Sequence, residues 1–546
     1  MKRSYIFKHS NIFKYLLAII TVIGLSHWQS FAQTLPRAGD LDPTFGTGGK
    51  VMVSMLPDAT GNTGLRALID PDGKIYHFGS TTTSPGVARA GLIRLTANGE
   101  LDPTWDADGI VVPSFTELSF SRFSNGAIQA DGKVLAGGSA SLGNLNYCLL
   151  ARFLPNGQLD TSFNDVGYSL FRNPGALQIN FYWSDVAVQQ DGKIVTSGSI
   201  DYQMGAARYN ADGTLDTTFG ENGYRLIQVS VLGELWDMKI ASDGKIVLAG
   251  KAETDFVNRN FTDYLIARLT LDGNLDVSFA GGAGVRQFDL TPGIVSDTEV
   301  IYGVQILPDG KILCVGRSGD VTNNPIDAVL MRFTSDGQFD TSFGTKGSGY
   351  RTIDYNGEHN LPQDLAVQTD GKIVIASFNG QGSDFLVQRL LANGDFDTSF
   401  GSGGSVETDL GGNDYPFSVN LTGDKILLSG YCGRTTGTIQ KLCSVRYLQN
   451  GQTANTATFR GRAVNLLGRG IANAQITIRN AVTNESQTVM TDRTGNFQLA
   501  DTVLAQQYIV TAQARRCVFQ QSPLTVNFNN PDTNVLLRTN CFYPIK

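Results

Sequence analysis

Short runs of apolar or alternating residues recur along most of the chain, each bounded by Gly, Asp or Asn, as is typical of β-strands joined by tight turns. Up to residue 452 these runs repeat one unit: an Asp-Gly-Lys turn, an apolar strand, a variable loop, a second strand carrying one Arg, and a polar Gly turn. Units this small cannot bury their own apolar faces, so they are expected to stack into an array. The turn lysines are Lys74, Lys133, Lys193, Lys245, Lys311, Lys372 and Lys425.

Each unit is predicted to hold four strands. In the fourth unit they cover residues 224–229, 236–241, 245–250 and 263–270. We therefore predict an all-β chain whose main part is a seven-bladed β-propeller of four-stranded blades, because a closed ring leaves few free sheet edges. In this prediction the Asp-Gly-Lys turn joins strands two and three, and the Arg lies on strand four.

A second motif, Leu/Phe-Asp-x-Ser/Thr-aromatic, lies between the units. Because its first copy precedes the first unit and none follows the last, it is expected to lead into a blade. The copies begin at Leu41, Leu101, Leu159, Leu215, Leu275, Phe339 and Phe396. Together with the Asp-Gly-Lys turn and the Arg, this motif resembles the delta-60 repeat family of bacterial exported proteins over residues 40–452. The resemblance implies a propeller and brings no catalytic residues.

One Arg stands at the same place in every unit, among apolar neighbours. A buried Arg needs an acidic partner, and the motif Asp that follows is the nearest candidate. We expect structural ion pairs that fix blade geometry, with anion binding as the alternative. The arginines are Arg94, Arg152, Arg208, Arg268, Arg332, Arg389 and Arg446. The aspartates are Asp102, Asp160, Asp216, Asp276, Asp340 and Asp397.

The two ends of the chain differ from the repeats. Residues 1–32 resemble a signal peptide, with basic residues, an apolar stretch over 15–25 and a small-x-small site at 30–32. The apolar stretch is short for a membrane span, so we predict a secreted or cell-surface protein. The propeller is assigned to residues 33–453. Residues 454–546 lose the period and predict a small β-sandwich.

Within that last segment, the runs at 461–464, 470–474 and 491–497 resemble the carboxypeptidase regulatory-like domain. The resemblance implies a transthyretin-like accessory module without chemistry of its own.

Six cysteines in an exported chain favour disulfides. Local pairing predicts Cys432 with Cys443 and Cys517 with Cys541. Cys148 and Cys314 lie in strand-like runs of different units and are expected to be buried thiols.

Candidate chemistry is sparse. The formal net charge of −7 argues against a nucleic-acid partner. Beyond the leader only His77 and His359 remain, and no zinc site or His-based triad can be assembled. Turns beginning at Asp70, Asp106 and Asn210 carry Asp/Asn-x-Asp-Gly but lack the remaining ligands of a calcium loop. We expect no cofactor, with calcium as an open alternative.

The most promising acids share one repeat position, six residues before the hairpin Asp: Asp185, Asp237 and Asp364, with Asn125 in a fourth copy. If their strand lies near the axis, several carboxylates converge there, as the paired acids of a glycosidase do. The alternative is side-chain capping of the strand entry. Trp183 and Trp236, nearby, either stack on a sugar ring or pack between blades.

The sequence thus favours a non-enzymatic binding or interaction scaffold whose ligand is an unknown protein or carbohydrate. Since rigid scaffolds carry function on variable loops, the ligand is expected on the loop face. The residues to test there are Trp183, Asp185, Asp237, His359 and Asp364. Two alternatives stay open: a glycoside hydrolase or lyase acting on an extracellular polysaccharide, and a structural envelope component.

Overall fold

The computed structural model describes residues 36–541, except 85–86, 174–180, 201, 230–231, 254–261, 292–297, 320–325, 356, 381–382, 435–438, 452–455, 482–483, 485, 504–505 and 529–533. The predicted signal peptide lies outside these residues. The chain divides into two compact units, one of Arg37–Gly451 and one containing Gln452–Lys546. No helix among the described residues is long and apolar enough to cross a membrane.

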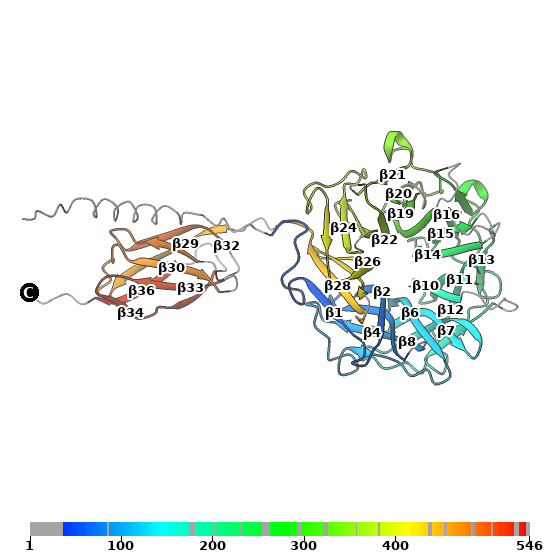
Figure 1. The fold of residues 1–546 in the computed structure, drawn as a ribbon, viewed down its shortest axis with the longest axis horizontal. Helices are drawn as coiled ribbons and strands as arrows, with labels where there is room; N and C mark the ends of the chain where they lie inside the picture. The colour runs from blue at the N-terminus through cyan, green and yellow to red at the C-terminus, as the bar shows by residue number, and fades with distance from the viewer. Residues whose placement is uncertain are drawn as a thin grey trace, which may run out of the picture. The chain divides into compact units, whose positions relative to one another are not determined.

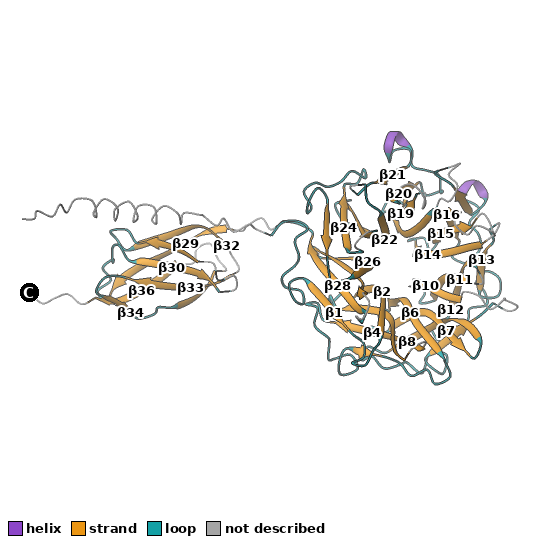
Figure 2. Cartoon of the chain, viewed as in Figure 1, coloured by secondary structure: helices purple, strands orange, loops and turns teal. Residues whose placement is uncertain are grey.

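The strands of Arg37–Gly451 form seven four-stranded antiparallel sheets among the described residues, arranged around one axis (Figure 1). The fold is therefore a β-propeller. Strands dominate it almost completely, apart from the short 3-10 turns η1 (Ala280–Gly282) and η2 (Thr345–Gly347) (Figure 2).

Each sheet has a first strand next to the axis and a fourth strand at the rim. The first strands are β2 (Gly61–Ile69), β6 (Phe120–Ile128), β10 (Phe181–Val188), β14 (Leu232–Ile240), β18 (Val300–Ile306), β22 (Asn360–Val367) and β26 (Asn413–Thr422). The second strands are β3 (Ile75–Ser84), β7 (Val134–Leu142), β11 (Ile194–Ile200), β15 (Ile246–Glu253), β19 (Ile312–Ser318), β23 (Ile373–Asn379) and β27 (Lys425–Arg434). The third strands are β4 (Val87–Leu95), β8 (Leu145–Phe153), β12 (Gln203–Tyr209), β16 (Thr262–Leu269), β20 (Asp327–Phe333), β24 (Phe385–Leu390) and β28 (Lys441–Leu448). The fourth strands are β5 (Ile110–Val111), β9 (Tyr168–Phe171), β13 (Tyr224–Ile227), β17 (Val285–Phe288), β21 (Tyr350–Ile353), β25 (Ser405–Thr408) and β1 (Lys50–Val53).

The last sheet is completed by the first strand of the chain. β1 pairs antiparallel with β28, with Lys50 opposite Val445 and Val53 opposite Leu442. Strands from the two ends of the repeat region therefore share one sheet and close the ring.

The predicted division of each unit into strands is wrong by one strand. Residues 224–227, expected to begin a blade, form β13, the rim strand of the preceding sheet. The Asp-Gly-Lys turn consequently joins strands one and two, and the Arg lies on strand three. The Leu/Phe-Asp motif lies within a sheet, between strands three and four, so it does not lead into a blade. Local periodicity shows which runs pair through a tight turn. It does not show which strand begins a sheet, because that is set by β1, which joins the last sheet as its fourth strand.

The two ends of the propeller carry different connections. Because consecutive strands run antiparallel, the Asp-Gly-Lys turns and the Leu/Phe-Asp loops lie at one end, which we call the hairpin end. The variable segments lie at the other, the loop end. Of these segments, 113–124 and 139–146 are described in full, whereas 173–184, 252–262, 289–302 and 317–326 extend outside the described residues.

The hairpins form for local reasons. In the third sheet Gly192 has a positive φ of 84°, and Asp191 Oδ1 accepts a hydrogen bond from the Lys193 N–H at 3.0 Å. In the seventh copy Thr422 lies directly opposite Lys425, so the turn shortens to Gly423 and Asp424. The altered residue order there gives a different turn.

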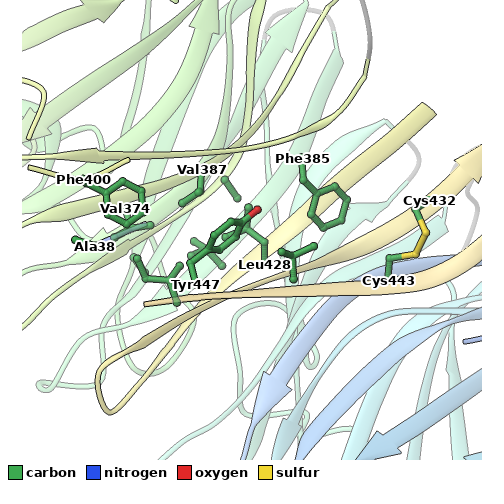
Figure 3. Packing of buried hydrophobic residues seen from close by; sticks show 14 residues of the cluster. Ala38, Val374, Phe385, Val387, Phe400, Leu428, Cys432, Cys443 and Tyr447 are labelled. Atoms are coloured by element: carbon green, nitrogen blue, oxygen red, sulfur yellow. A yellow bond between two sulfur atoms is a disulfide. The ribbon is translucent and has the colours of Figure 1, made fainter. Parts of the chain in front are cut away.

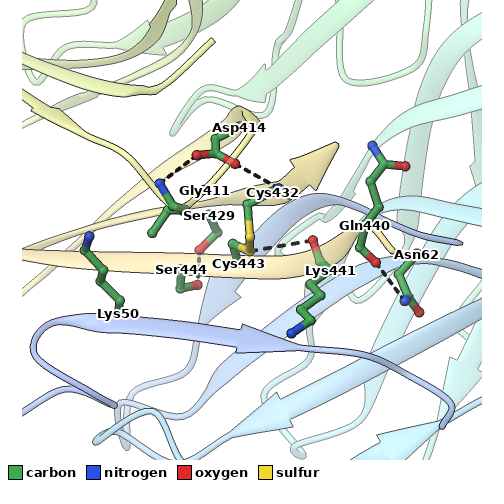
Figure 4. The surroundings of a disulfide bond; sticks show 12 residues. Lys50, Asn62, Gly411, Asp414, Ser429, Cys432, Gln440, Lys441, Cys443 and Ser444 are labelled. Carbon is green, nitrogen blue, oxygen red and sulfur yellow. Dashed lines mark hydrogen bonds between the residues drawn. A yellow bond between two sulfur atoms is a disulfide. The ribbon is translucent and has the colours of Figure 1, made fainter. Parts of the chain in front are cut away.

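Neighbouring sheets pack face to face through apolar side chains. Figure 3 shows one such layer, in which Val374 and Phe385 face Leu428 and Tyr447 of the last sheet, all of them buried. At the edge of this layer Cys432 and Cys443 form a disulfide between β27 and β28 (Figure 4).

The thiols of Cys148 and Cys314 are free and buried in other layers of the propeller. Burial raises the pKa of both thiols.

The C-terminal unit consists of two four-stranded sheets that share one apolar cluster, including Phe459, Ile476, Val510 and Leu537. One sheet has the order β32 (Asn496–Val503), β29 (Thr456–Asn465), β36 (Asn534–Cys541) and β34 (Cys517–Phe519). The other has the order β31 (Ser486–Met490), β30 (Gln475–Asn480), β33 (Gln506–Gln513) and β35 (Leu524–Phe528). A disulfide joins Cys517 on β34 to Cys541 on β36.

Candidate functional site

The seven repeated arginines form a belt at the hairpin end of the propeller. In each, the guanidinium Nε lies 2.7 to 2.9 Å from a carboxylate oxygen of a Leu/Phe-Asp motif. The pairs are Arg94–Asp102, Arg152–Asp160, Arg208–Asp216, Arg268–Asp276, Arg332–Asp340, Arg389–Asp397 and Arg446–Asp42. Asp42, in the first motif copy, is the partner that sequence reasoning left unassigned for Arg446.

Each belt guanidinium also reaches the neighbouring sheet. Arg208 Nη1 donates to the carbonyl of Leu271, in the Gly turn of the next sheet, at 2.8 Å. Its guanidinium lies over the ring of Phe219, the aromatic residue of its own motif, at 4.9 Å. The arginine therefore ties a strand, a loop and the next sheet together, which is the geometry of a structural ion pair.

The belt aspartates are strongly acidic. Burial opposes ionisation of Asp216, but hydrogen bonds from Lys193, Thr218 and Arg208 outweigh it and hold the pKa of this carboxyl well below its usual range. For Asp397 the same balance lowers the pKa to about 2. The lysine of the Asp-Gly-Lys turn thus has a second role, as a partner of the belt carboxylate.

Near the axis, every first strand carries a β-bulge at its middle. The register shifts lie between Gly64 and Ala67, Phe123 and Asn125, Trp183 and Asp185, Leu235 and Asp237, Ile301 and Gly303, Pro362 and Asp364, and Pro416 and Ser418. The repeat position of the predicted acids is therefore the residue directly after the bulge.

The carboxylates after the bulges bridge neighbouring first strands. Asp237 accepts the N–H of Met238 at 2.9 Å through Oδ1 and that of Val304, in the next sheet, at 2.8 Å through Oδ2. Asp364 accepts the N–H groups of Leu365 and Val419 at 2.8 and 3.0 Å in the same way. Each carboxylate thus bonds the backbone of its own strand, as the capping alternative expected, and also the backbone of the first strand in the following sheet.

Two cations that sequence reasoning missed lie among these acids. Arg66 occupies the wide bulge of β2, and its Nη1 lies 3.6 Å from Asp237 and 3.9 Å from Asp364. Lys239 Nζ lies 2.8 Å from Asp237 and 3.9 Å from Asp185. We call Arg66, Asn125, Asp185, Asp237, Lys239 and Asp364 the axial polar layer. Arg66 stands six residues before the hairpin Asp72, at the repeat position of the acids, so the sequence held a signal for it, whereas Lys239 has no basic counterpart in the other units.

The acids of the axial polar layer differ in acidity. Asp185, Asp237 and Asp364 are 7%, 0% and 6% exposed. Burial raises the pKa of Asp185 to about 7, although Lys239 counteracts it. For Asp237, burial also opposes ionisation, but the charges of Lys239 and Arg66 outweigh it and lower the pKa. Asp185 is therefore much less acidic than Asp237 and takes up a proton as the pH falls below about 7.

Two cavities lie on the axis, one on each side of this layer. The hairpin-side cavity, of about 240 Å³, is lined by residues at and after the bulges, including Asp185, Lys239, Gln305, Asp364 and Asn420. The loop-side cavity, of about 420 Å³, is lined by Thr63, Leu65, Arg66, Arg122, Ser124, Ser139, Ser184, Trp236, Tyr302, Gln363, Phe417 and Tyr431. Of these lining residues, Arg66 alone belongs to both cavities.

The loop-side cavity is built from equivalent positions. All seven first strands contribute a bulge residue to its wall. Trp236 and Tyr302 come from adjacent sheets, with ring centroids 5.0 Å apart, and Phe417 and Tyr431 lie 5.4 Å apart. None of the described lining residues is acidic. The cavity thus combines aromatic faces, hydroxyl and amide groups, and two arginines.

The other predicted site residues lie elsewhere. Asp185, Asp237 and Asp364 come together, but inside the channel and not on an exposed loop face as expected. His359 Nδ1 accepts the N–H of Ile326 at 2.8 Å, and this histidine is not among the lining residues of either cavity. His77 is buried on β3, 3.0 Å from Ser444 Oγ.

The side chain of Trp183 lies outside the described residues.

The turn carboxylates considered for calcium bond to their own backbone: Asp70 Oδ1 accepts the N–H groups of Asp72 and Lys74 at 2.9 and 2.8 Å. A different acidic group lies at the loop end, where carboxylate oxygens of Asp384, Asp409 and Asp414 lie within 4.8 Å of one another. In Figure 4, Asp414 stands beside the disulfide and accepts backbone N–H groups.

Six stretches of the chain match a family described as a domain of unknown function, DUF5122, with a β-propeller fold. They are residues 71–104, 129–163, 189–219, 241–279, 307–343 and 368–400. Each runs from an Asp-Gly-Lys hairpin to a Leu/Phe-Asp motif. No curated protein matches the chain in sequence.

Among solved structures, the chain is similar to a protein of unknown function from Dyadobacter fermentans, at 11% identity and a TM-score of 0.41, over 74% of this chain and 100% of that one. The polysaccharide lyase Uly1 is similar at 10% identity and 0.42, over 73% and 91%. An α-L-arabinanase of Penicillium chrysogenum is similar at 12% and 0.38, over 76% and 98%. The sequence matches are those of a β-propeller repeat family.

Proposed function

We propose that this protein is an exported binding protein that holds a carbohydrate in the loop-side cavity. In this proposal each four-stranded sheet is one blade of a seven-bladed propeller of the delta-60 type. The C-terminal unit is a carboxypeptidase regulatory-like sandwich that serves as an accessory module. No cofactor is needed.

The observation that carries the proposal is the composition of the cavity wall. Aromatic rings such as Trp236 and Tyr302 offer flat apolar faces to the C–H faces of a sugar. Ser124, Ser184 and Gln363 supply hydrogen-bonding groups around them. A volume of about 420 Å³ lies within the range of roughly 300 to 1,000 Å³ found for ligand sites.

The buried acids favour binding over catalysis. Both oxygens of Asp237 and of Asp364 already accept backbone hydrogen bonds, and neither acid lines the loop-side cavity. A catalytic carboxylate must reach the bond it cleaves. These carboxylates are explained by their role in ordering the first strands, which requires no contact with a substrate.

A glycoside hydrolase or lyase is the second candidate. It is favoured by one observation, the contrast between Asp185, with a pKa raised to about 7, and Asp237, with a lowered pKa. Such a pair resembles a general acid beside an ionised partner. In this reading the substrate enters the hairpin-side cavity, where Asp185 is part of the wall. A structural envelope component is a third reading.

A panel of polysaccharides, with binding and product release followed together, tests these readings. We expect binding without product release, loss of binding in Trp236→Ala, and retention in Tyr147→Ala, a half-buried tyrosine of β8 outside the cavity wall. Product release that disappears in Asp185→Asn would support the enzyme instead. A panel without any binding would contradict the proposal and favour the structural reading.

A further inference from the structure

The loop-side cavity has an unusual charge for this protein. The chain carries a formal net charge of −7, yet the charged side chains lining the cavity are Arg66 and Arg122. Arg66 lies in the axial polar layer, where Asp237 and Asp364 compensate it. Arg122 stands on the wall, two residues before the bulge of β6. This inference rests on the proposed function and names the class of sugar.

The two arginines and the Trp236–Tyr302 pair start from different first strands. In the order of first strands around the axis, β2 and β6 are neighbours and carry Arg66 and Arg122. The adjacent strands β14 and β18, on the far side of the ring, carry Trp236 and Tyr302. Arg66 nevertheless reaches across the axis, because its Nη2 donates a hydrogen bond to the carbonyl of Trp236 at 3.3 Å. A ring packed on Trp236 therefore lies beside the Arg66 guanidinium.

We propose that the loop-side cavity binds a sugar ring bearing a carboxylate, such as a uronic-acid unit of an anionic polysaccharide. The ring packs on Trp236 and Tyr302, and its carboxylate points toward Arg122 and Arg66. Guanidinium groups match the planar geometry of a carboxylate and form charge-assisted hydrogen bonds with it. The hydroxyls of Ser124 and Ser184, on the first strands β6 and β10, remain for the sugar hydroxyls.

Arg122 is the residue to change. Replacing Arg66 would strip the partner from buried Asp237 and Asp364 and so disturb the channel itself. Arg122→Met keeps the length of the side chain and removes its charge. Arg89→Met is the matched control, because Arg89 is exposed on β4 and outside the cavity wall.

The test is calorimetric binding by the full chain of matched neutral and uronate oligosaccharides, such as β-1,4-linked glucose and glucuronic acid oligomers of equal length, together with polysaccharides of both classes. We expect the uronate to bind about tenfold more tightly or better at low salt. The preference should shrink toward one in Arg122→Met and at high salt, and persist in Arg89→Met. Circular dichroism melting verifies that each variant is folded.

Two outcomes separate this inference from the function beneath it. Equal affinity for neutral and acidic sugars, with binding lost in Trp236→Ala, would overturn the proposed preference for a carboxylate but leave the proposed carbohydrate binding intact. A uronate preference that Arg122→Met leaves unchanged would also overturn it. Absence of binding to every sugar would overturn both.

Discussion

Replacing Asp42 tests how the propeller is closed. Asp42 Oδ2 lies 2.8 Å from Arg446 Nε, so this pair joins the two ends of the repeat region. Asp42 Oδ1 accepts hydrogen bonds from Thr44, at 3.0 Å from its N–H and 2.7 Å from its hydroxyl. In Asp42→Ala all three contacts disappear, and the buried guanidinium of Arg446 keeps its charge without its carboxylate.

The magnitude follows from the cost of an uncompensated buried charge. Removing one partner of a buried ion pair costs about 3 to 5 kcal/mol of unfolding free energy. Asp276→Ala breaks the equivalent pair, Arg268–Asp276, in another sheet. There the third and fourth strands, β16 and β17, are consecutive in the chain and stay connected by their loop. Because Asp42 lies on the free segment that carries β1, its loss also loosens β1 from β28. We therefore expect Asp42→Ala to destabilise at least as much as Asp276→Ala.

Tryptophan fluorescence in urea measures this effect in the propeller alone. Trp105, Trp183 and Trp236 lie within Arg37–Gly451, and no tryptophan follows residue 451. The fourth tryptophan, Trp28, belongs to the predicted signal peptide, which the mature protein is expected to lack. Asp40→Ala is the control, because Asp40 is exposed and its carboxylate bonds only to nearby Arg37 among the described contacts, so a change below about 0.5 kcal/mol is expected. An Asp42→Ala effect below about 1 kcal/mol would refute the reasoning and show that closure depends on strand pairing alone.

Three further outcomes are expected. Peptide mapping without reductant should recover Cys432 linked to Cys443, and recovery of free thiols there would contradict the pairing. Burial lowers the pKa of His77 to about 4, below its usual 6.5, so this group makes stability rise with pH between about 4 and 6.5. The urea midpoint should therefore change less across that pH range in His77→Gln than in the unmodified protein. An equal change of the midpoint with pH in both proteins would argue against the buried neutral ring. For Asp185 the sign is opposite, because a pKa raised to about 7 makes stability fall as pH rises from about 4 to 7; Asp185→Asn should remove this fall, and equal losses in both proteins would show that another group titrates.

The sequence predicted local features well and long-range ones poorly. Each Asp-Gly-Lys hairpin depends on its own Asp and Gly, so six of the seven turns were evident from the residues alone. The first strand of each sheet was misplaced, because β1 pairs with β28 across nearly the whole repeat region. No periodic signal records that pairing.

The axis was predicted in part. Asp185, Asp237 and Asp364 share a repeat position, and the structure gathers them in one layer. Arg66 stands at the same repeat position, six residues before Asp72, but as a cation it was not grouped with the acids, and Lys239 has no basic counterpart in the other units. The bulges were also invisible, since a bulge depends on the register between two strands. For the same reason the aromatic wall formed by Trp236, Tyr302 and Phe417 was recognised only at its tryptophan.

The bridging carboxylates have a consequence for how such a cavity changes over evolution. Asp237 and Asp364 bond backbone N–H groups of two sheets at once, so the spacing of the first strands is held independently of the bulge side chains beside them. Trp236, Tyr302, Gln363 and the bulge residues other than Arg66, which pairs with both acids, can then be exchanged without altering the frame. Ligand preference is thereby separated from foldability, and these bulge positions form a set of interchangeable sites on which selection can act one residue at a time.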